Sequence, residues 1–155
     1  MKGHEKIIES LNKRLAEELT AINQYFIHAE MCENWGYKKL HGMICKRSID
    51  EMKHAEKLIG RILFLDGKPI VSDLNKIHIG TEVPKFHEND HKAEVTAIHG
   101  YNESIKLAFE LGDGGTRELL ESILREEEAH MDLIEAQLDQ IKQMGAQNYL
   151  AEQID

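Results

Sequence analysis

Apolar residues recur along most of the chain at spacings of three and four, the repeat of an amphipathic α-helix rather than of a β-strand. Four segments keep this repeat over their whole length, and a short apolar segment follows the last of them. The pattern predicts an all-α protein with helices at about residues 4–34, 38–65, 83–111 and 116–144 and a short helix at about 146–153.

The breaks between these segments predict how the helices connect. Gly36 turns the chain after the first helix, and the second ends where Gly67 supplies a C-terminal signal and Pro69 forbids continuation. Residues 66–82 have no helical stripe, and at ~3.3 Å per extended residue they can run the length of a helix of about 28 residues. With GDGG as a short last turn, this predicts one domain over 1–155, a four-helix bundle whose single long crossover makes its second and third helices parallel.

An acidic residue interrupts the apolar stripe of each long helix. Glu51 stands where the stripe of Ile44, Leu58 and Ile62 calls for an aliphatic residue. In two of the four helices a histidine follows the glutamate by three residues, on the same helical face. The whole set is Glu18, Glu51, His54, Glu94, Glu127 and His130. Each helix is therefore expected to bury one carboxylate.

The spacing of these acids indicates that they meet. Glu18 and Glu51 are 33 residues apart, as are Glu94 and Glu127, so two antiparallel helix pairs would place all four at one height. Burying an unpaired carboxylate costs several kcal/mol, and no lysine or arginine lies in the stripes near that level. Two metal ions would supply the charge, and oxygen and imidazole ligands without thiolates suit iron or manganese. Two lone glutamates with two Glu-x-x-His elements match the known pattern of ferritin-like di-iron proteins.

Each histidine also needs an orienting partner. Asp50 precedes His54 by four residues and Glu126 precedes His130 by four. We expect each acid to accept the second ring N–H of the histidine on its own helix.

Other candidates have plainer interpretations. Glu88 and His91 form a third Glu-x-x-His pair without a counterpart 33 residues away, and we expect them to be solvated. Tyr25 and Tyr101 are expected to be core aromatics rather than to face the metals. Met52 lies about 100° around the helix from the acid before it, so it points outward. On spacing alone, it is expected to pack in a subunit contact rather than to bind haem.

The amino-acid composition limits which binding partners and which cellular location can be expected. Nineteen basic and twenty-eight acidic residues give a formal charge of −9, which disfavours nucleic acid and anionic membrane surfaces and favours cations. Cys32 and Cys45 form no C-x-x-C pair, which argues against a disulfide framework or a zinc knuckle. The charged N-terminus and the lack of a long apolar run predict no signal peptide and no membrane span. The expected location is the reducing cytoplasm.

The chain resembles bacterioferritins over essentially its whole length, in MKGHEKIIESLNK, AINQYFIHAEM, SIDEMKHAEKLIGRILFLDGKP, ILREEEAHMDLIE and MGAQNYL. The second Glu-x-x-His element separates it from classical ferritins, and the missing C-x-x-C pair separates it from rubrerythrins. The resemblance implies a ferroxidase site in which Glu51 and Glu127 bridge two irons. Glu18 with His54, and Glu94 with His130, would complete its two ends.

The resemblance also implies the reaction and the assembly. Fe(II) would be oxidised by dioxygen or peroxide, and a ferric mineral would be deposited for iron storage and detoxification inside a hollow shell, a homo-oligomer of twenty-four subunits built from dimers. Haem b would lie between two subunits with Met52 of each as axial ligand, and a ferredoxin-type reductase would be the redox partner. Many relatives have a histidine where this chain has Lys46, so an accessory iron site that depends on that histidine is in question.

Two other functions are compatible with the same residues. The chain could be a haem-carrying structural subunit of a mixed shell, although the complete ligand set argues against loss of catalysis. It could also be a di-iron oxygenase or peroxide scavenger. Accumulation of a ferric core far above two irons per chain would separate storage from both.

Overall fold

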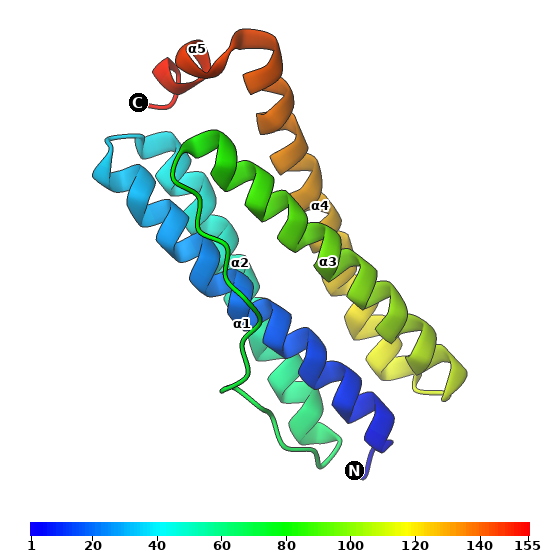
Figure 1. Cartoon of the computed structure of the whole chain (residues 1–155). Helices are drawn as coiled ribbons and strands as arrows, with labels where there is room; N and C mark the ends of the chain where they lie inside the picture. The colour runs from blue at the N-terminus through cyan, green and yellow to red at the C-terminus, as the bar shows by residue number, and fades with distance from the viewer.

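The computed structural model describes residues 1–155 and contains helices without any strand. The helices are α1 (Glu5–Asn34), α2 (Lys38–Phe64), α3 (Val83–Glu110), α4 (Gly114–Met144) and α5 (Ala146–Ala151). The four long helices form a bundle in which α1 and α2 are one antiparallel pair and α3 and α4 the other (Figure 1). The predicted all-α four-helix bundle with one long crossover and a short C-terminal helix is confirmed.

The helix ends follow from local capping. The Asp113 side chain accepts a hydrogen bond from the backbone N–H of Thr116 at 3.0 Å, so α4 begins at Gly114, two residues before the expected start. Helix α3 begins at Val83 with Pro84 in its first turn, where a missing N–H costs nothing.

The end of α2 differs in detail from the expectation. The left-handed residue is Asp66, with φ of 59°, and the backbone N–H of Gly67 donates to Ile62 O at 2.9 Å. Position 67 requires a glycine because of packing rather than because of its backbone conformation. A Cβ there would lie 2.7 Å from Cγ2 of Ile8 on α1. The glycine therefore permits close packing of α1 against the chain that leaves α2.

The apolar core is divided into two clusters by a polar middle layer. The cluster toward the start of α1 contains Ile7, Leu11, Leu15, Ala55, Leu58, Ile62, Leu65, Ala97, Tyr101, Leu120 and Ile123. The cluster toward the other end of the bundle contains Tyr25, Ala29, Cys32, Leu40, Ile44, Val83, Phe86 and Tyr149. These clusters fix the helices on both sides of the polar layer, so that the side chains between them are held by packing above and below.

The crossover between α2 and α3 lies along α1 (Figure 1). Its backbone N–H groups donate to one polar stripe of α1, from Asn75 to Thr20 Oγ1 (2.8 Å), from His78 to Gln24 Oε1 (3.0 Å) and from Gly80 to His28 Nε2 (3.1 Å). The crossover is thereby fixed over the space between α1 and α3.

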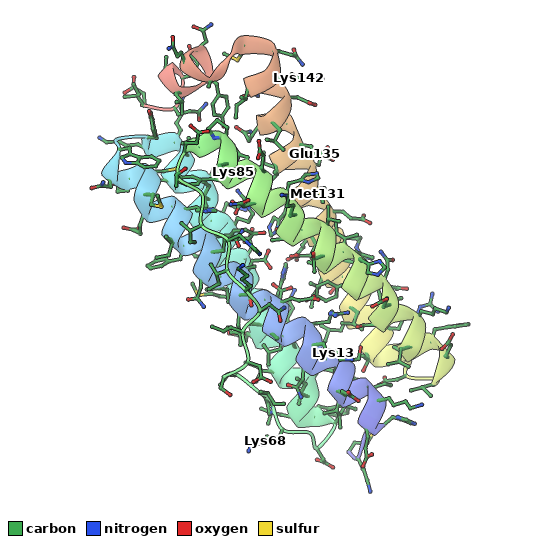
Figure 2. The ribbon with its side chains drawn as sticks, in the orientation of Figure 1. Lys13, Lys68, Lys85, Met131, Glu135 and Lys142 are labelled. Carbon is green, nitrogen blue, oxygen red and sulfur yellow. The ribbon has the colours of Figure 1, made fainter.

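The outer faces of the bundle carry many charged side chains (Figure 2). Glu88 pairs with Lys85 at 2.9 Å and His91 contacts Glu135 at 3.3 Å, so the third Glu-x-x-His pair lies at the surface as expected. Met52 points outward with 46% of its surface exposed. No helix is both long enough and apolar enough to cross a lipid bilayer.

Candidate metal centre

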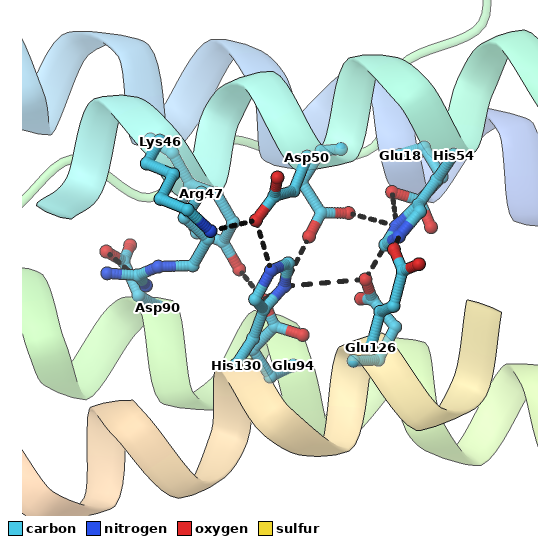
Figure 3. A network of polar contacts seen from close by, with 12 residues as sticks. Glu18, Lys46, Arg47, Asp50, His54, Asp90, Glu94, Glu126 and His130 are labelled. Atoms are coloured by element: carbon cyan, nitrogen blue, oxygen red, sulfur yellow. Dashed lines mark hydrogen bonds and ion pairs between the residues drawn. The ribbon is translucent and has the colours of Figure 1, made fainter. Parts of the chain in front are cut away.

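The polar middle layer brings all six predicted side chains together (Figure 3). Their ligand atoms fall into two groups, in each of which all atoms lie within 4.8 Å of one another. The groups are Glu18, Glu51, His54 and Glu127, and Glu51, Glu94, Glu127 and His130. Glu51 and Glu127, here named the shared carboxylates, belong to both groups. The geometry therefore offers two adjacent metal positions with two carboxylates in common.

The two histidines aim into this cluster with Nδ1. His54 Nδ1 lies 2.8 Å from an oxygen of Glu127, and His130 Nδ1 lies 2.8 Å from an oxygen of Glu51. Neither Nδ1 atom has a hydrogen-bond partner of acceptable geometry. Both nitrogens thus point between the carboxylates, as ligands of a common ion would.

Several buried carboxylate oxygens also lack partners. They are Oε2 of Glu18, both oxygens of Glu51, Oε2 of Glu94 and Oε1 of Glu127. All four glutamates are at most 1% exposed, so these oxygens have almost no contact with solvent. Because buried charge without a partner is costly, the donor set fits two metal ions, and oxygen with imidazole suits iron.

The surroundings shift the proton affinity of the ligands strongly. Burial raises the pKa of Glu18 and of Glu94 well above the usual value, and the charges of the shared carboxylates raise it further. Burial alone would lower the pKa of each histidine, but the nearby carboxylates raise that of His130 to about 12 and that of His54 also far above its usual value. The metal-free cluster therefore holds protons at neutral pH, and incoming metal must displace them.

The outer partners of the histidines are the predicted acids with the pairing exchanged. His54 Nε2 contacts Glu126 Oε2, and His130 Nε2 donates to Asp50 Oδ2 at 3.1 Å (Figure 3). Pairing within one helix was wrong because Nδ1 of each ring is turned into the cluster, which leaves Nε2 facing the opposite helix. Lys46 contacts the same oxygen of Asp50 at 3.4 Å.

Tyr25 and Tyr101 are not plain core aromatics, so that expectation was wrong. The Tyr25 hydroxyl donates to Glu94 Oε1 at 2.6 Å, and the Tyr101 hydroxyl donates to Glu18 Oε1. Both rings are fully buried. A signal was present in the sequence, since each tyrosine follows the lone glutamate of its own helix by seven residues and reaches the lone glutamate of the other.

Two buried arginines lie one helical turn from the cluster, contrary to the expectation that none would be near it. Arg47 is 2% exposed, stacks 4.7 Å from the Tyr25 ring and pairs with Asp90 at 3.3 Å. Arg14 is 7% exposed and pairs with Glu17 at 3.0 Å. Each arginine precedes a cluster glutamate by four residues, but its charge is already matched by its own acid. The cluster therefore still needs cations of its own.

A bundle of four helices with a central layer of four glutamates and two histidines defines a ferritin-like protein of the di-metal carboxylate class. Residues 8–144 match a family model described as the ferritin-like domain. A bacterioferritin of Brucella melitensis is 40% identical over 149 residues, which cover 96% of this chain and 92% of the relative. Bacterioferritins of Rhodobacter capsulatus (39%, covering 96% and 92%) and Streptomyces coelicolor (39%, covering 100% and 93%) are similar to the same extent.

The chain belongs to the bacterioferritin family. Family membership and the cluster of carboxylates and histidines together identify it as an iron-storage protein.

Proposed function

We propose that the chain is a ferroxidase that oxidises Fe(II) to Fe(III) at the six-residue centre and passes the product to a ferric mineral. The observation that carries the proposal is the pair of ligand groups that share Glu51 and Glu127. Two adjacent irons held by common carboxylates can each lose one electron, so that dioxygen or peroxide is reduced in two-electron steps.

The residues have distinct roles in this proposal. Glu18 and His54 hold the iron at one end, Glu94 and His130 hold the iron at the other, and the shared carboxylates bridge the two. The acids that receive Nε2–H of the histidines fix the ring orientation, which keeps Nδ1 free for the metal. The iron ions are substrate here, and the protein supplies their placement and the negative charge that holds them.

The assembly and the haem complete the proposal. We infer a hollow homo-oligomeric shell of twenty-four subunits built from dimers, located in the cytoplasm, with a ferredoxin-type reductase as redox partner. Haem b would lie between two subunits with Met52 of each as axial ligand. The half-exposed Met52 beside the 42% exposed Ile49 on the outer face of α2 supports this, because a free thioether on an apolar surface is available to a group held between two copies.

The test is Fe(II) oxidation under limited oxygen, with irons counted per chain. The parent protein is expected to oxidise about two irons per chain rapidly, one at each of its two metal positions, and then to grow a mineral. A variant with Glu51→Ala and Glu127→Ala is expected to lose the rapid phase, whereas Glu88→Ala, which alters the surface Glu-x-x-His pair, is expected to keep it. Equal rapid phases in all three proteins would overturn the ferroxidase site, and oxidation without mineral growth would overturn storage in favour of a peroxide scavenger.

A further inference from the structure

Two hollows meet on the crossover side of the bundle. The inner cavity, of about 410 Å³, lies between α1, α3 and the crossover and reaches Glu18, Glu51 and Glu127 of the metal centre. The outer hollow, of about 430 Å³, lies nearer the start of α1. Glu17 and Asn75 are the only residues that line both, so they form the boundary between them.

Glu17 is held in place at this boundary with one oxygen free. Its side chain is 14% exposed, and Oε1 accepts a hydrogen bond from Arg14 Nη2 at 3.0 Å. Oε2 is buried and has no hydrogen-bond partner. Arg14 is itself fixed, because its Nη1 donates to Ser104 Oγ at 3.1 Å and to the carbonyl of Gly100. The free oxygen is therefore presented by a rigid support rather than by a mobile surface side chain.

The neighbouring residue also has an unpartnered oxygen. Glu18, at one end of the metal centre, is 1% exposed, lines the inner cavity and leaves Oε2 without a hydrogen-bond partner. Glu17 and Glu18 therefore both line one cavity, and each has a buried carboxylate oxygen without a partner. Oxygen ligands of this kind suit a divalent cation such as Fe(II).

Acidic side chains line both hollows. The outer hollow has Glu9, Glu17 and Asp73 against Lys13 and the paired Arg14. The inner cavity has four glutamates in its lining, three of them from the metal centre, against the exposed Lys76 and Lys92. The excess of acidic groups is therefore larger toward the metal centre, which favours movement of a cation from the outer hollow inward.

We propose that Glu17 is a transfer ligand, which takes a divalent cation from the outer hollow on its free Oε2 and hands it to Glu18 in the metal centre. No bond other than the metal coordination changes in this step, and the metal keeps its oxidation state. The inference rests on the proposed function, because it needs a metal centre that fills. Glu17 is not a member of that centre, so its loss should change how fast metal arrives and not how much is bound.

The experiment measures the rate at which the metal-free assembly takes up Co²⁺, a stand-in for Fe(II), from the visible absorption of bound Co²⁺ after rapid mixing. The Glu17→Gln variant keeps the shape of the side chain and the hydrogen bond from Arg14 but removes the ionisable carboxyl group, whose pKa burial raises to about 7, so uptake is measured at pH 8. It is expected to fill about tenfold more slowly than the parent, the scale of an electrostatic steering effect, and to reach the same final number of ions. Glu17→Asp, which keeps the charge, is expected to recover part of the rate. Glu103→Gln, an exposed carboxylate on α3 that lines neither hollow, is the matched control and is expected to fill at the parent rate.

The outcomes separate the two proposals. Equal uptake rates in the parent and Glu17→Gln would overturn the transfer role alone. A lower final number of ions in Glu17→Gln would also overturn it, since Glu17 would then hold a resident ion or support the centre. A parent that binds no Co²⁺ at the centre would overturn the proposed function and the transfer role together.

Discussion

The two ends of the candidate metal centre present the same set of ligand side chains and have different surroundings. At one end, Tyr101 donates to Glu18 with no cation over its ring, and His54 is fully buried. At the other, Tyr25 donates to Glu94, and His130 is 8% exposed. The Arg47 guanidinium covers only the second tyrosine. The ligands of one end recur at the other with a shift of 76 residues, as from Glu18 to Glu94 and from His54 to His130. Arg47 has no counterpart at that shift, because position 123 is an isoleucine.

This comparison separates the interactions that occur at both ends of the centre from those that occur at one end only. The lone glutamate, the tyrosine and the histidine with its outer acid recur at both ends, so these four side chains form the common surroundings of the two metal positions. Arg47 with Asp90 occurs at one end only, so it belongs to the packing of that half rather than to the ligand set.

The largest effect is expected when metal binding is lost at both ends of the centre. Substitution of the shared carboxylates, Glu51→Gln with Glu127→Gln, should abolish metal binding, because each metal position depends on both. Ligand binding stabilises the folded state by about 2.7 kcal/mol at one hundred times Kd. We therefore expect Co²⁺ to raise the thermal midpoint of the parent by several degrees, in line with about 4–8 °C per kcal/mol for small domains and less for larger ones, and to leave that of the variant unchanged. A Co²⁺-dependent rise in the variant would contradict the shared geometry.

Substitution of one histidine should abolish metal binding at its own end and leave binding at the other end intact. His54→Ala and His130→Ala are each expected to bind one Co²⁺ per chain where the parent binds two, measured by absorption titration, because each ring serves one ligand group. The metal-free His54→Ala protein should also be the less stable of the two, by roughly 1 kcal/mol, because the His54 ring is fully buried whereas His130 is 8% exposed. Loss of both ions in either variant would show that the ends do not bind independently.

Metal uptake should depend steeply on pH at both ends. The pKa values of His54, His130, Glu18 and Glu94 are raised, so these groups carry protons in the metal-free protein at neutral pH and lose them to the metal. Affinity must then increase as pH rises, by about tenfold per pH unit for each proton released. Proton release measured in weak buffer during Co²⁺ addition checks this, and affinity that is constant between pH 6 and pH 8 would contradict it.

The smallest effect is expected when the hydroxyl of Tyr25 or Tyr101 is removed. Tyr25→Phe and Tyr101→Phe each remove one hydrogen bond to a carboxylate, an interaction worth about 1.5–3 kcal/mol when the acceptor is charged. Each should weaken binding at its own end by about tenfold to about 150-fold and leave the other end unaltered, as resolved by calorimetric titration. If both variants bind metal at both ends with the affinity of the parent, the tyrosines contribute to packing and not to metal binding.

The sequence was sufficient for the helices and the six cluster residues because their signals are local. A glutamate in an apolar stripe, a histidine three residues later and a spacing of 33 can all be recognised without knowing how the helices pack. The exchange between Asp50 and Glu126 as histidine partners could not be predicted, since it depends on which helix each Nε2 faces.

Other contacts were missed for a similar reason. A buried Arg47 has the same appearance in sequence as a solvated one, and only the packed bundle brings Asp90 to it from a distant segment. Glu17 beside Glu18 also appears to be an ordinary surface acid, and its position at the boundary of two hollows depends on where the crossover lies.

The most direct test of the central claim is the number of Fe(II) ions bound per chain under anaerobic conditions, before any oxidant is added. We predict two in the parent, one in His54→Ala or His130→Ala, and none when both shared carboxylates are replaced. A parent that binds no Fe(II), or a number that stays the same when Glu51 and Glu127 are replaced, would contradict it.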